Sequence, residues 1–213
     1  MKYIKLFESF EEYDPYELMI MHPNKKAEMI KIELLKRKQN LNLIKDLITL
    51  GANLDWQDKG SYNRTILHLT VVHNHPVVTE MLIDAGADIN LQSEAGETAL
   101  HLAAKDENSF IANMLIDAGG NVNAQDKRKN TPLHYSAYDG KTSITEILIG
   151  AGAELNVQDV NGNTPLHDAV YNDHEDIVRV LLKAGARIDI QNHDGKLPYD
   201  LAQTEEMKKL LQP

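Results

Sequence analysis

The chain of 213 residues contains no cysteine, which excludes disulfide bonds, thiolate metal sites and cysteine nucleophiles. This composition is compatible with a reducing compartment. A net positive charge is also missing, because 22 Lys and Arg stand against 32 Asp and Glu for a formal charge of −10. Since nucleic-acid and anionic-membrane binders need a basic surface, the charge argues against both classes of partner.

Long apolar runs are absent as well. No window approaches the roughly 20 apolar residues that a membrane-spanning helix needs. The stretch MKYIKLFESFEEYD places a charged or polar residue every two or three positions, unlike the apolar segment of a signal peptide. We therefore expect an intracellular, cytoplasmic protein with no membrane partner.

Catalytic motifs are missing too. The sequence has no glycine-rich phosphate loop, no nucleophile elbow and no His-Glu-x-x-His helix. We therefore expect no catalytic residues, no enzyme activity and no cofactor.

The chain does contain a regular internal repeat. Four Thr-x-Leu-His segments place their histidines 33 residues apart, at His68, His101, His134 and His167. Gly-Ala or Gly-Gly pairs recur alongside them, beginning at Gly51, Gly86, Gly119, Gly152 and Gly185. A fixed period of this length is typical of a solenoid of stacked units.

Each repeat carries the signals of two helices. The threonine suits an N-cap, and the proline that follows it in two repeats suits the first helical position. The glycine suits the left-handed residue just past a helix end. An aliphatic residue of the kind found in cores stands eight positions before each glycine, at Leu43, Val78, Ile111, Ile144 and Ile177. We predict two antiparallel helices per unit, followed by a protruding loop with a turn at its tip.

The sequence resembles the ankyrin repeat family, most clearly in TPLHYSAYDGKTSITEILIGAGAELNVQD from Thr131 and TPLHDAVYNDHEDIVRVLLKAGARIDIQN from Thr164. The resemblance implies an all-α repeat solenoid of helix-turn-helix units with protruding β-hairpin loops. It divides the chain into a partly helical or flexible N-terminal segment (1–23), an N-terminal capping repeat (24–57), a repeat with a two-residue hairpin insertion (58–92), three regular repeats (93–125, 126–158 and 159–191) and a C-terminal capping repeat (192–213).

The N-terminal segment has a helical stripe of its own. Leu6, Phe10 and Tyr13 share one helical face, and the Asp14-Pro15 and His22-Pro23 pairs predict breaks. The stripe either covers the exposed edge of the N-terminal capping repeat or docks on a partner. The opening MKYIKLFESF is similar to short leaders of bacteriophage proteins.

The resemblance also implies a role for the four histidines. Each would bond back to the threonine of its own repeat and across to a neighbouring backbone, forming a structural ladder. A metal site is not expected, because stacked repeats lie roughly 10 Å apart, whereas zinc ligands lie about 2 Å from the ion. Invariant glutamines predict a second supporting ladder at Gln57, Gln92, Gln125, Gln158 and Gln191.

Family resemblance points to the loop tips and the outward side of each first helix as the partner surface. Tyrosines are frequent at interface centres, and Tyr138 and Tyr171 hold the same position in neighbouring repeats; the alternative is that they only cover the groove. The predicted partner-binding residues are Tyr62, Arg64, His73, Lys105, Lys127, Arg128, Lys129, Tyr138, Asp139, Tyr171 and Asn172.

One tip departs from the others. Lys129 stands where three other repeats have glycine, at Gly96, Gly162 and Gly195. We predict a strained, positive φ at Lys129. Together with Lys127 and Arg128 it forms a basic tip that suits an acidic patch on a partner; the alternative is a turn that has drifted.

These observations predict a non-enzymatic protein-binding module that is monomeric alone and acts by occupancy, as adaptor or inhibitor. Two alternatives remain open. One is a virus or symbiont effector that neutralises a host protein, and the other is a regulatory subunit of a partner enzyme.

Overall fold

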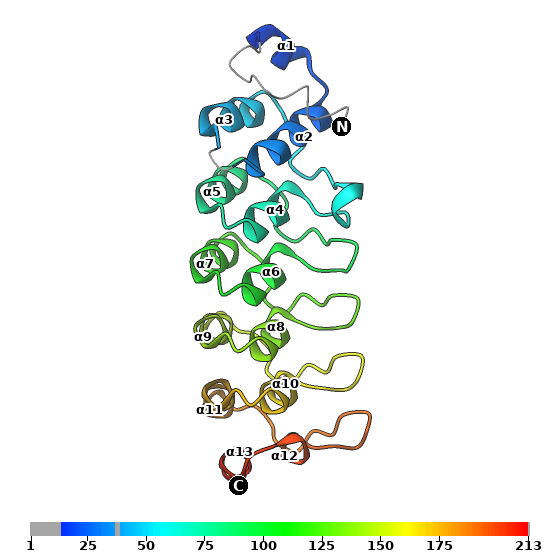
Figure 1. The fold of residues 1–213 in the computed structure, drawn as a ribbon, viewed down its shortest axis with the longest axis vertical. Helices are drawn as coiled ribbons and strands as arrows, with labels where there is room; N and C mark the ends of the chain where they lie inside the picture. The colour runs from blue at the N-terminus through cyan, green and yellow to red at the C-terminus, as the bar shows by residue number, and fades with distance from the viewer. Residues whose placement is uncertain (1–13, 37–38, 213) are drawn as a thin grey trace.

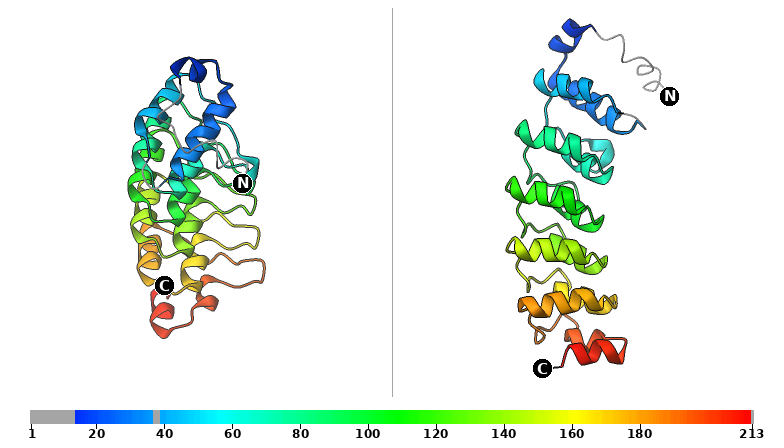
Figure 2. Two further views of the ribbon diagram at one scale, coloured as in Figure 1. Left: turned by 45° about the horizontal axis from the view of Figure 1, so that its top comes forward. Right: turned by 90° about the vertical axis from the view of Figure 1, so that its left-hand side faces the viewer.

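The computed structural model of the chain describes residues 14–36 and 39–212. Its helices form two parallel columns along an elongated molecule, with loops projecting beyond one column (Figure 1). Two further views show the same regular stack (Figure 2). The predicted all-α repeat solenoid is confirmed.

The two columns hold the first and second helices of the repeats. The first column contains α2 (Pro23–Leu34), α4 (Ile66–Val72), α6 (Ala99–Lys105), α8 (Pro132–Tyr138), α10 (Pro165–Tyr171) and α12 (Pro198–Leu201). The second contains α3 (Leu41–Thr49), α5 (Pro76–Asp84), α7 (Ser109–Asp117), α9 (Thr142–Gly150), α11 (Glu175–Ala184) and α13 (Glu205–Leu210). Helix α1 (Pro15–Ile20) lies at the N-terminal end, and a 3₁₀ turn spans Lys59–Ser61. Neighbouring helices in each column pack against one another.

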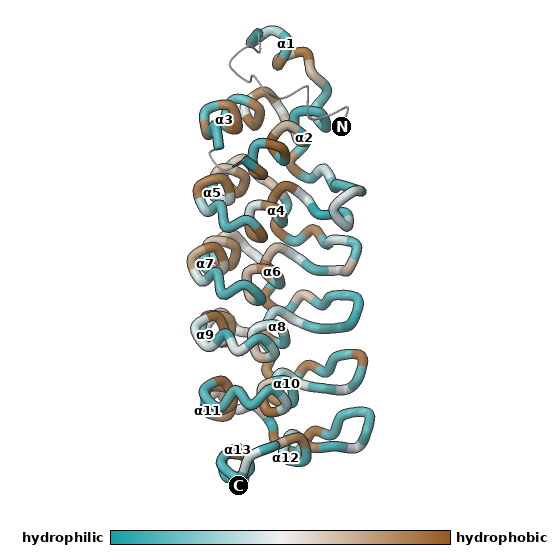
Figure 3. Tube along the Cα trace, in the orientation of Figure 1, coloured by the Kyte–Doolittle hydropathy of each residue, from teal (hydrophilic) through white to brown (hydrophobic). Residues whose placement is uncertain are grey.

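The core lies between the columns. The aliphatic residues eight positions before each glycine are buried, as predicted: Leu43, Val78, Ile111, Ile144 and Ile177. The leucines of the Thr-x-Leu-His segments are buried as well: Leu67, Leu100, Leu133 and Leu166. Hydrophobic residues concentrate on the helices, whereas the protruding loops are mostly hydrophilic (Figure 3). Within the described ranges, no helix has the length and apolar character to cross a bilayer.

The helices begin and end at the predicted residues. Thr65 is the N-cap of α4, where its hydroxyl accepts from the His68 N–H at 3.4 Å. Gly185 ends α11 with a left-handed φ of 98°. The earlier glycines of this series also have positive φ. A β-carbon is disfavoured in that conformation, so glycine suits the sharp exit from the second helix.

The loops are held by backbone hydrogen bonds rather than by paired strands. Among the described residues there is no β-strand, only an isolated antiparallel bridge between Asp58 and Arg64. The Asp126 N–H donates to the Asn130 carbonyl at 2.9 Å and closes one tip. Successive tips are also bonded, as where the Val160 N–H donates to the Arg128 carbonyl at 2.9 Å. The tips therefore form one connected edge.

At the N-terminal end, the two Xaa-Pro pairs start helices rather than merely interrupting them. Asp14 caps α1 by accepting from the Tyr16 N–H at 3.0 Å. His22 caps α2 by accepting from the Asn24 N–H at 3.2 Å. The predicted stripe of Leu6, Phe10 and Tyr13 lies outside the described residues and stays a prediction.

The basic tip has the backbone conformation that its sequence predicts. Lys129 has φ 61°, and the glycines at the same turn position are also left-handed. Replacing Lys129 with glycine should raise the free energy of unfolding by about 1 kcal/mol, because a β-carbon is strained at positive φ. Urea unfolding followed by circular dichroism measures this change. Lys127→Gly is the matched control, because Lys127 is not left-handed; a Lys129→Gly variant no more stable than the parent would contradict the strain.

Candidate functional site

Four buried imidazoles each join two repeats. At the start of α8 the Thr131 N–H donates to His134 Nδ1 at 3.1 Å, and His134 Nε2 lies 3.2 Å from the Asn163 carbonyl of the next repeat. Since Nδ1 accepts, the neutral tautomer carries its proton on Nε2 and donates it to that carbonyl. The same two contacts recur at His68, His101 and His167, whose Nε2 atoms lie 2.9, 3.1 and 3.2 Å from the carbonyls of Glu97, Asn130 and Lys196.

Burial keeps these imidazoles neutral. It lowers the pKa of His134 to about 4, and it lowers the pKa of the other three. Both ring nitrogens are engaged, so neither is free to bind a metal ion or to take a proton from a substrate. Over residues 14–36 and 39–212, no group of three or more His, Asp or Glu side chains is arranged to hold a metal.

A second ladder of side chains supports the loops. Gln57 Nε2 donates to the Gln92 carbonyl at 2.8 Å, and Gln92 Nε2 donates to the Gln125 carbonyl at 2.9 Å. The Gln158 amide repeats the pattern with Gln191 at 3.0 Å. These bonds to backbone carbonyls occupy three of the five predicted glutamines in connecting repeats, whereas the Gln125 amide makes no such bond to a described residue.

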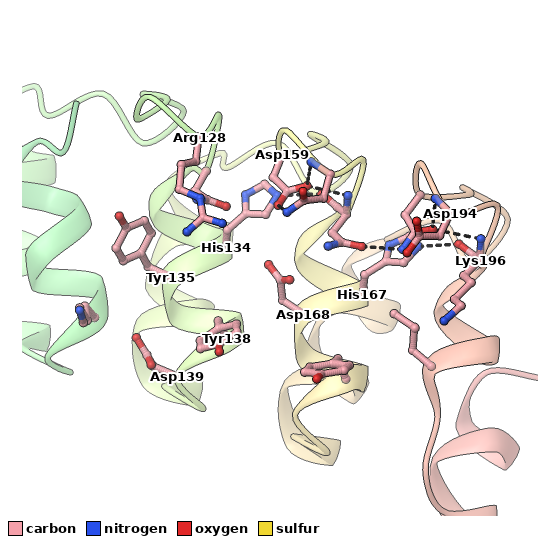
Figure 4. Close-up of a pocket in the computed structure, with 17 residues that line it drawn as sticks. Arg128, His134, Tyr135, Tyr138, Asp139, Asp159, His167, Asp168, Asp194 and Lys196 are labelled. Atoms are coloured by element: carbon pink, nitrogen blue, oxygen red, sulfur yellow. Dashed lines mark hydrogen bonds between the residues drawn. The ribbon is translucent and has the colours of Figure 1, made fainter. Parts of the chain in front are cut away.

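The concave side of the last repeats holds a groove of about 580 Å³ between the loop tips and α8, α10 and α12. Figure 4 shows side chains from these elements converging on it. Tyr138 and Tyr171 line it from equivalent ends of α8 and α10, with 54% and 57% of their surfaces exposed. The groove is therefore a polar cleft with two accessible aromatic rings.

The groove floor departs from the pattern of the repeat. The second helical turn carries leucine in three repeats, at Leu69, Leu102 and Leu201, but Tyr135 and Asp168 hold this position in the two repeats that form the groove. The Tyr135 hydroxyl lies 3.0 Å from Asp126 Oδ2 and 3.2 Å from Glu97 Oε1, and it donates to one of them at a time. Burial and these two carboxylates raise the Tyr135 pKa, so the hydroxyl keeps its proton.

Asp168 is the floor residue without a partner. Its carboxyl is partly buried and makes no hydrogen bond or ion pair with any described residue, although Arg128 and Lys196 line the same groove. Burial, and secondarily the charge of Asp159, raise the Asp168 pKa to about 8. Much of the Asp168 population is therefore neutral at pH 7. In Figure 4 it lies between His134 and His167, above Tyr138.

The structure brings only some of the predicted partner-binding residues together. The groove is lined by Lys105, Arg128, Tyr138, Asp139 and Tyr171. The other predicted residues, which do not line it, are Tyr62, Arg64, His73, Lys127, Lys129 and Asn172. Of these, Tyr62 is 70% exposed at the longer tip, while Arg64 is partly buried and pairs with Glu97 at 3.4 Å. Arg64 therefore joins repeats and is less available to a partner than expected.

Sequence reasoning missed Tyr135 and Asp168. The available signal was the 33-residue register, in which a polar residue replaces leucine at both positions. A polar side chain at a position that is elsewhere apolar indicates either a buried hydrogen bond or a binding site. Tyr135 is the first case and Asp168 has the properties of the second.

Comparison with known proteins identifies one matching family. A model of ankyrin repeats, which describes three copies, matches residues 32–126 and again residues 108–192. Together the two matches span more than half of the chain. No curated protein matches the sequence.

The bridging role of the histidines leads to a stability prediction. His134→Ala should lower the free energy of unfolding by about 1–3 kcal/mol, because it leaves the Thr131 amide and the Asn163 carbonyl without their partner. Thermal and urea unfolding measure the loss. Elemental analysis is the second readout: stoichiometric zinc in the parent that disappears in the variant would overturn the structural role. His73→Ala, at an exposed histidine, is the control.

Proposed function

The chain belongs to the ankyrin repeat family, and on that premise we propose that it is a non-enzymatic module that binds a partner protein in the groove beside α8, α10 and α12. Proteins of this family are generally protein–protein interaction modules. The module acts by occupying a surface of its partner, as an adaptor or an inhibitor. This role needs a complementary binding surface but no chemical step.

The observation that carries this proposal is the pair of exposed tyrosines in the groove. Tyr138 and Tyr171 are more than half exposed in a concave surface. Tyrosine buries a large area with few rotatable bonds, and its hydroxyl bonds readily at the edge of an interface. A partner that enters the groove would cover both rings, and their burial would contribute much of the binding free energy.

The absence of enzyme activity is part of the proposal. Ankyrin repeat proteins are typically non-enzymatic. Two histidines line the groove, His134 and His167. In each, Nδ1 accepts from the N–H of the threonine three residues earlier, and Nε2 donates to a backbone carbonyl of the next repeat. A general base needs a free nitrogen within reach of a substrate proton, and these rings do not offer one.

The basic tip extends the proposed contact surface to an acidic patch on the partner. Lys127, Arg128 and Lys129 are all exposed on a chain of net charge −10, and Arg128 also lines the groove. A local positive patch on an acidic protein attracts an acidic partner and disfavours basic ones, so it acts mainly on association rate and specificity.

Alanine at both Tyr138 and Tyr171 should weaken partner binding by at least about 2 kcal/mol with little change in melting temperature, because both rings are anchors on the surface. Affinity capture from the native lysate, followed by titration with the captured protein, measures the loss. Phe110→Ala is the matched control, since Phe110 is an exposed aromatic of α7 in the second column.

The outcome of that capture also distinguishes the roles. A captured host signalling or defence protein supports an effector, and a metabolic enzyme supports a regulatory subunit. A partner that binds the double alanine variant as tightly as the parent would contradict the groove as the binding site.

The basic tip leads to a kinetic prediction. Lys129→Gly should slow association with the partner and reduce its dependence on salt, because one of three clustered cations is lost. Stopped-flow association at low and high ionic strength measures both effects. Lys183→Ala removes an exposed charge of α11 in the second column and should leave the rate nearly unchanged. Equal rates for Lys129→Gly and the parent at every salt concentration would support a drifted turn instead.

A further inference from the structure

We infer that the groove receives an arginine side chain of the partner, with its guanidinium paired to Asp168 and stacked against Tyr138 and Tyr171. The inference deepens the proposed function and rests on it. Asp168 is the natural receptor because it stands on the groove floor without a partner of its own. A ligand can supply the hydrogen bonds and the opposite charge that a partly buried, unpaired carboxyl lacks.

The groove lining carries both carboxylates and basic groups, so the unpartnered carboxyl on the floor, and not the net charge, is the feature that a cation can pair with. Four aspartates and three basic residues line the groove: Asp139, Asp159, Asp168 and Asp194; Lys105, Arg128 and Lys196. The basic residues make no ion pair with Asp168. Asp159 is also committed, because it accepts the Asn161 and Asn163 N–H groups at 2.8 Å. Asp168 is therefore the floor carboxyl that remains available, and a cation that pairs with it favours its ionised form.

Arginine fits this setting better than lysine. Asp168 and Tyr171 are three residues apart on α10 and so share one face of the helix, while Tyr138 lines the groove from α8. A planar guanidinium can form two hydrogen bonds to a carboxylate and at the same time stack on an aromatic face. It is also less strongly hydrated than an ammonium group, so it enters a partly buried site more readily.

The register of the repeat supports a binding role for Asp168. Leucine at the same position in three other repeats meets the packing requirement of the fold, and Leu69 and Leu102 are buried. An unpaired carboxyl at this position destabilises the folded state, because burial disfavours its charge. A residue that weakens the fold at a groove floor is expected where a ligand supplies the missing partner.

The inference predicts a pH dependence of binding. The titratable groups that line the groove with Asp168 are the charged residues named above, Tyr138 and Tyr171, Tyr135, whose raised pKa keeps it protonated, and His134 and His167, which stay neutral. In the free groove the Asp168 pKa is about 8, so the carboxyl is mostly protonated at pH 7. A bound guanidinium favours the ionised form and displaces that proton. Affinity should therefore rise as pH rises toward 8 and level off above it.

The test uses the full chain, labelled with ¹⁵N, and the peptide acetyl-Gly-Arg-Gly-amide as the probe. Saturable shifts of the amide signals around Tyr138, Asp168 and Tyr171 are expected. The citrulline peptide, a neutral isostere, should bind at least about tenfold more weakly, because the ion pair is lost. Binding of the arginine peptide should strengthen about tenfold between roughly pH 6.5 and 8.5.

Two variants make the result specific to Asp168. Asp168→Asn should bind the arginine peptide about tenfold more weakly and lose the pH dependence, whereas Asp117→Asn, at an exposed carboxyl of α7 in the second column, should stay within about twofold of the parent. Asp168→Leu provides a second variant, because leucine at this register is compatible with the fold in three other repeats. This variant should also lose binding of the arginine peptide, while its NMR spectrum keeps the dispersed signals of a folded protein.

Several outcomes would overturn the inference. These are a citrulline peptide, or a peptide with lysine in place of arginine, that binds as tightly as the arginine peptide; an Asp168→Asn variant that binds as the parent does; or no saturable shift at all. None of them needs the partner protein. A failed peptide titration alongside a captured partner that depends on the tyrosines would therefore refute the arginine site and leave the proposed function intact.

Discussion

The fold depends on one buried contact, the neutral imidazole that joins a threonine of its own repeat to a carbonyl of the next. Helices α4, α6, α8 and α10 have seven residues each, and helices of this length are unstable in isolation. The imidazole accepts from the backbone N–H of the N-cap threonine and so secures the helix start. Its second nitrogen holds the base of the following loop. One side chain therefore sets both the helix and the loop that enclose the groove, and His134 and His167 line that groove directly.

The groove arises where the repeat departs from its own pattern. Leucine holds the position below the tips in three other repeats, but the polar side chains of Tyr135 and Asp168 stand there in the two repeats that form the groove. Tyr135 completes its hydrogen bonding with carboxylates of two loops. Asp168 does not, and burial keeps it largely neutral. The four imidazoles of the frame have both ring nitrogens bonded, whereas the carboxyl of Asp168 at the candidate site makes no hydrogen bond or ion pair with a described residue.

Much of the fold could be predicted from the sequence, because its determinants act over a few residues. A threonine cap, a glycine with positive φ and the lysine strained at the same turn position as three glycines are local properties. The candidate site was less predictable. The repeat period places Tyr138 and Tyr171 in one groove, but the protonation state of Asp168 depends on its burial and, secondarily, on the charge of Asp159 in the loop before α10. The ion pair of Arg64 with Glu97 joins two repeats and likewise has no local signal.

The connected edge of loop tips has a consequence for how such a surface can change over time. Successive tips are joined through backbone N–H and carbonyl groups, as between Val160 and Arg128. These groups are present whatever the side chain, provided the residue is not proline. Substitutions at the tips can therefore alter charge, size and polarity while the bonds that align the loops persist. The surface has the property that evolvability requires: the recognition residues are free to diverge, and the scaffold that presents them is insulated from that divergence.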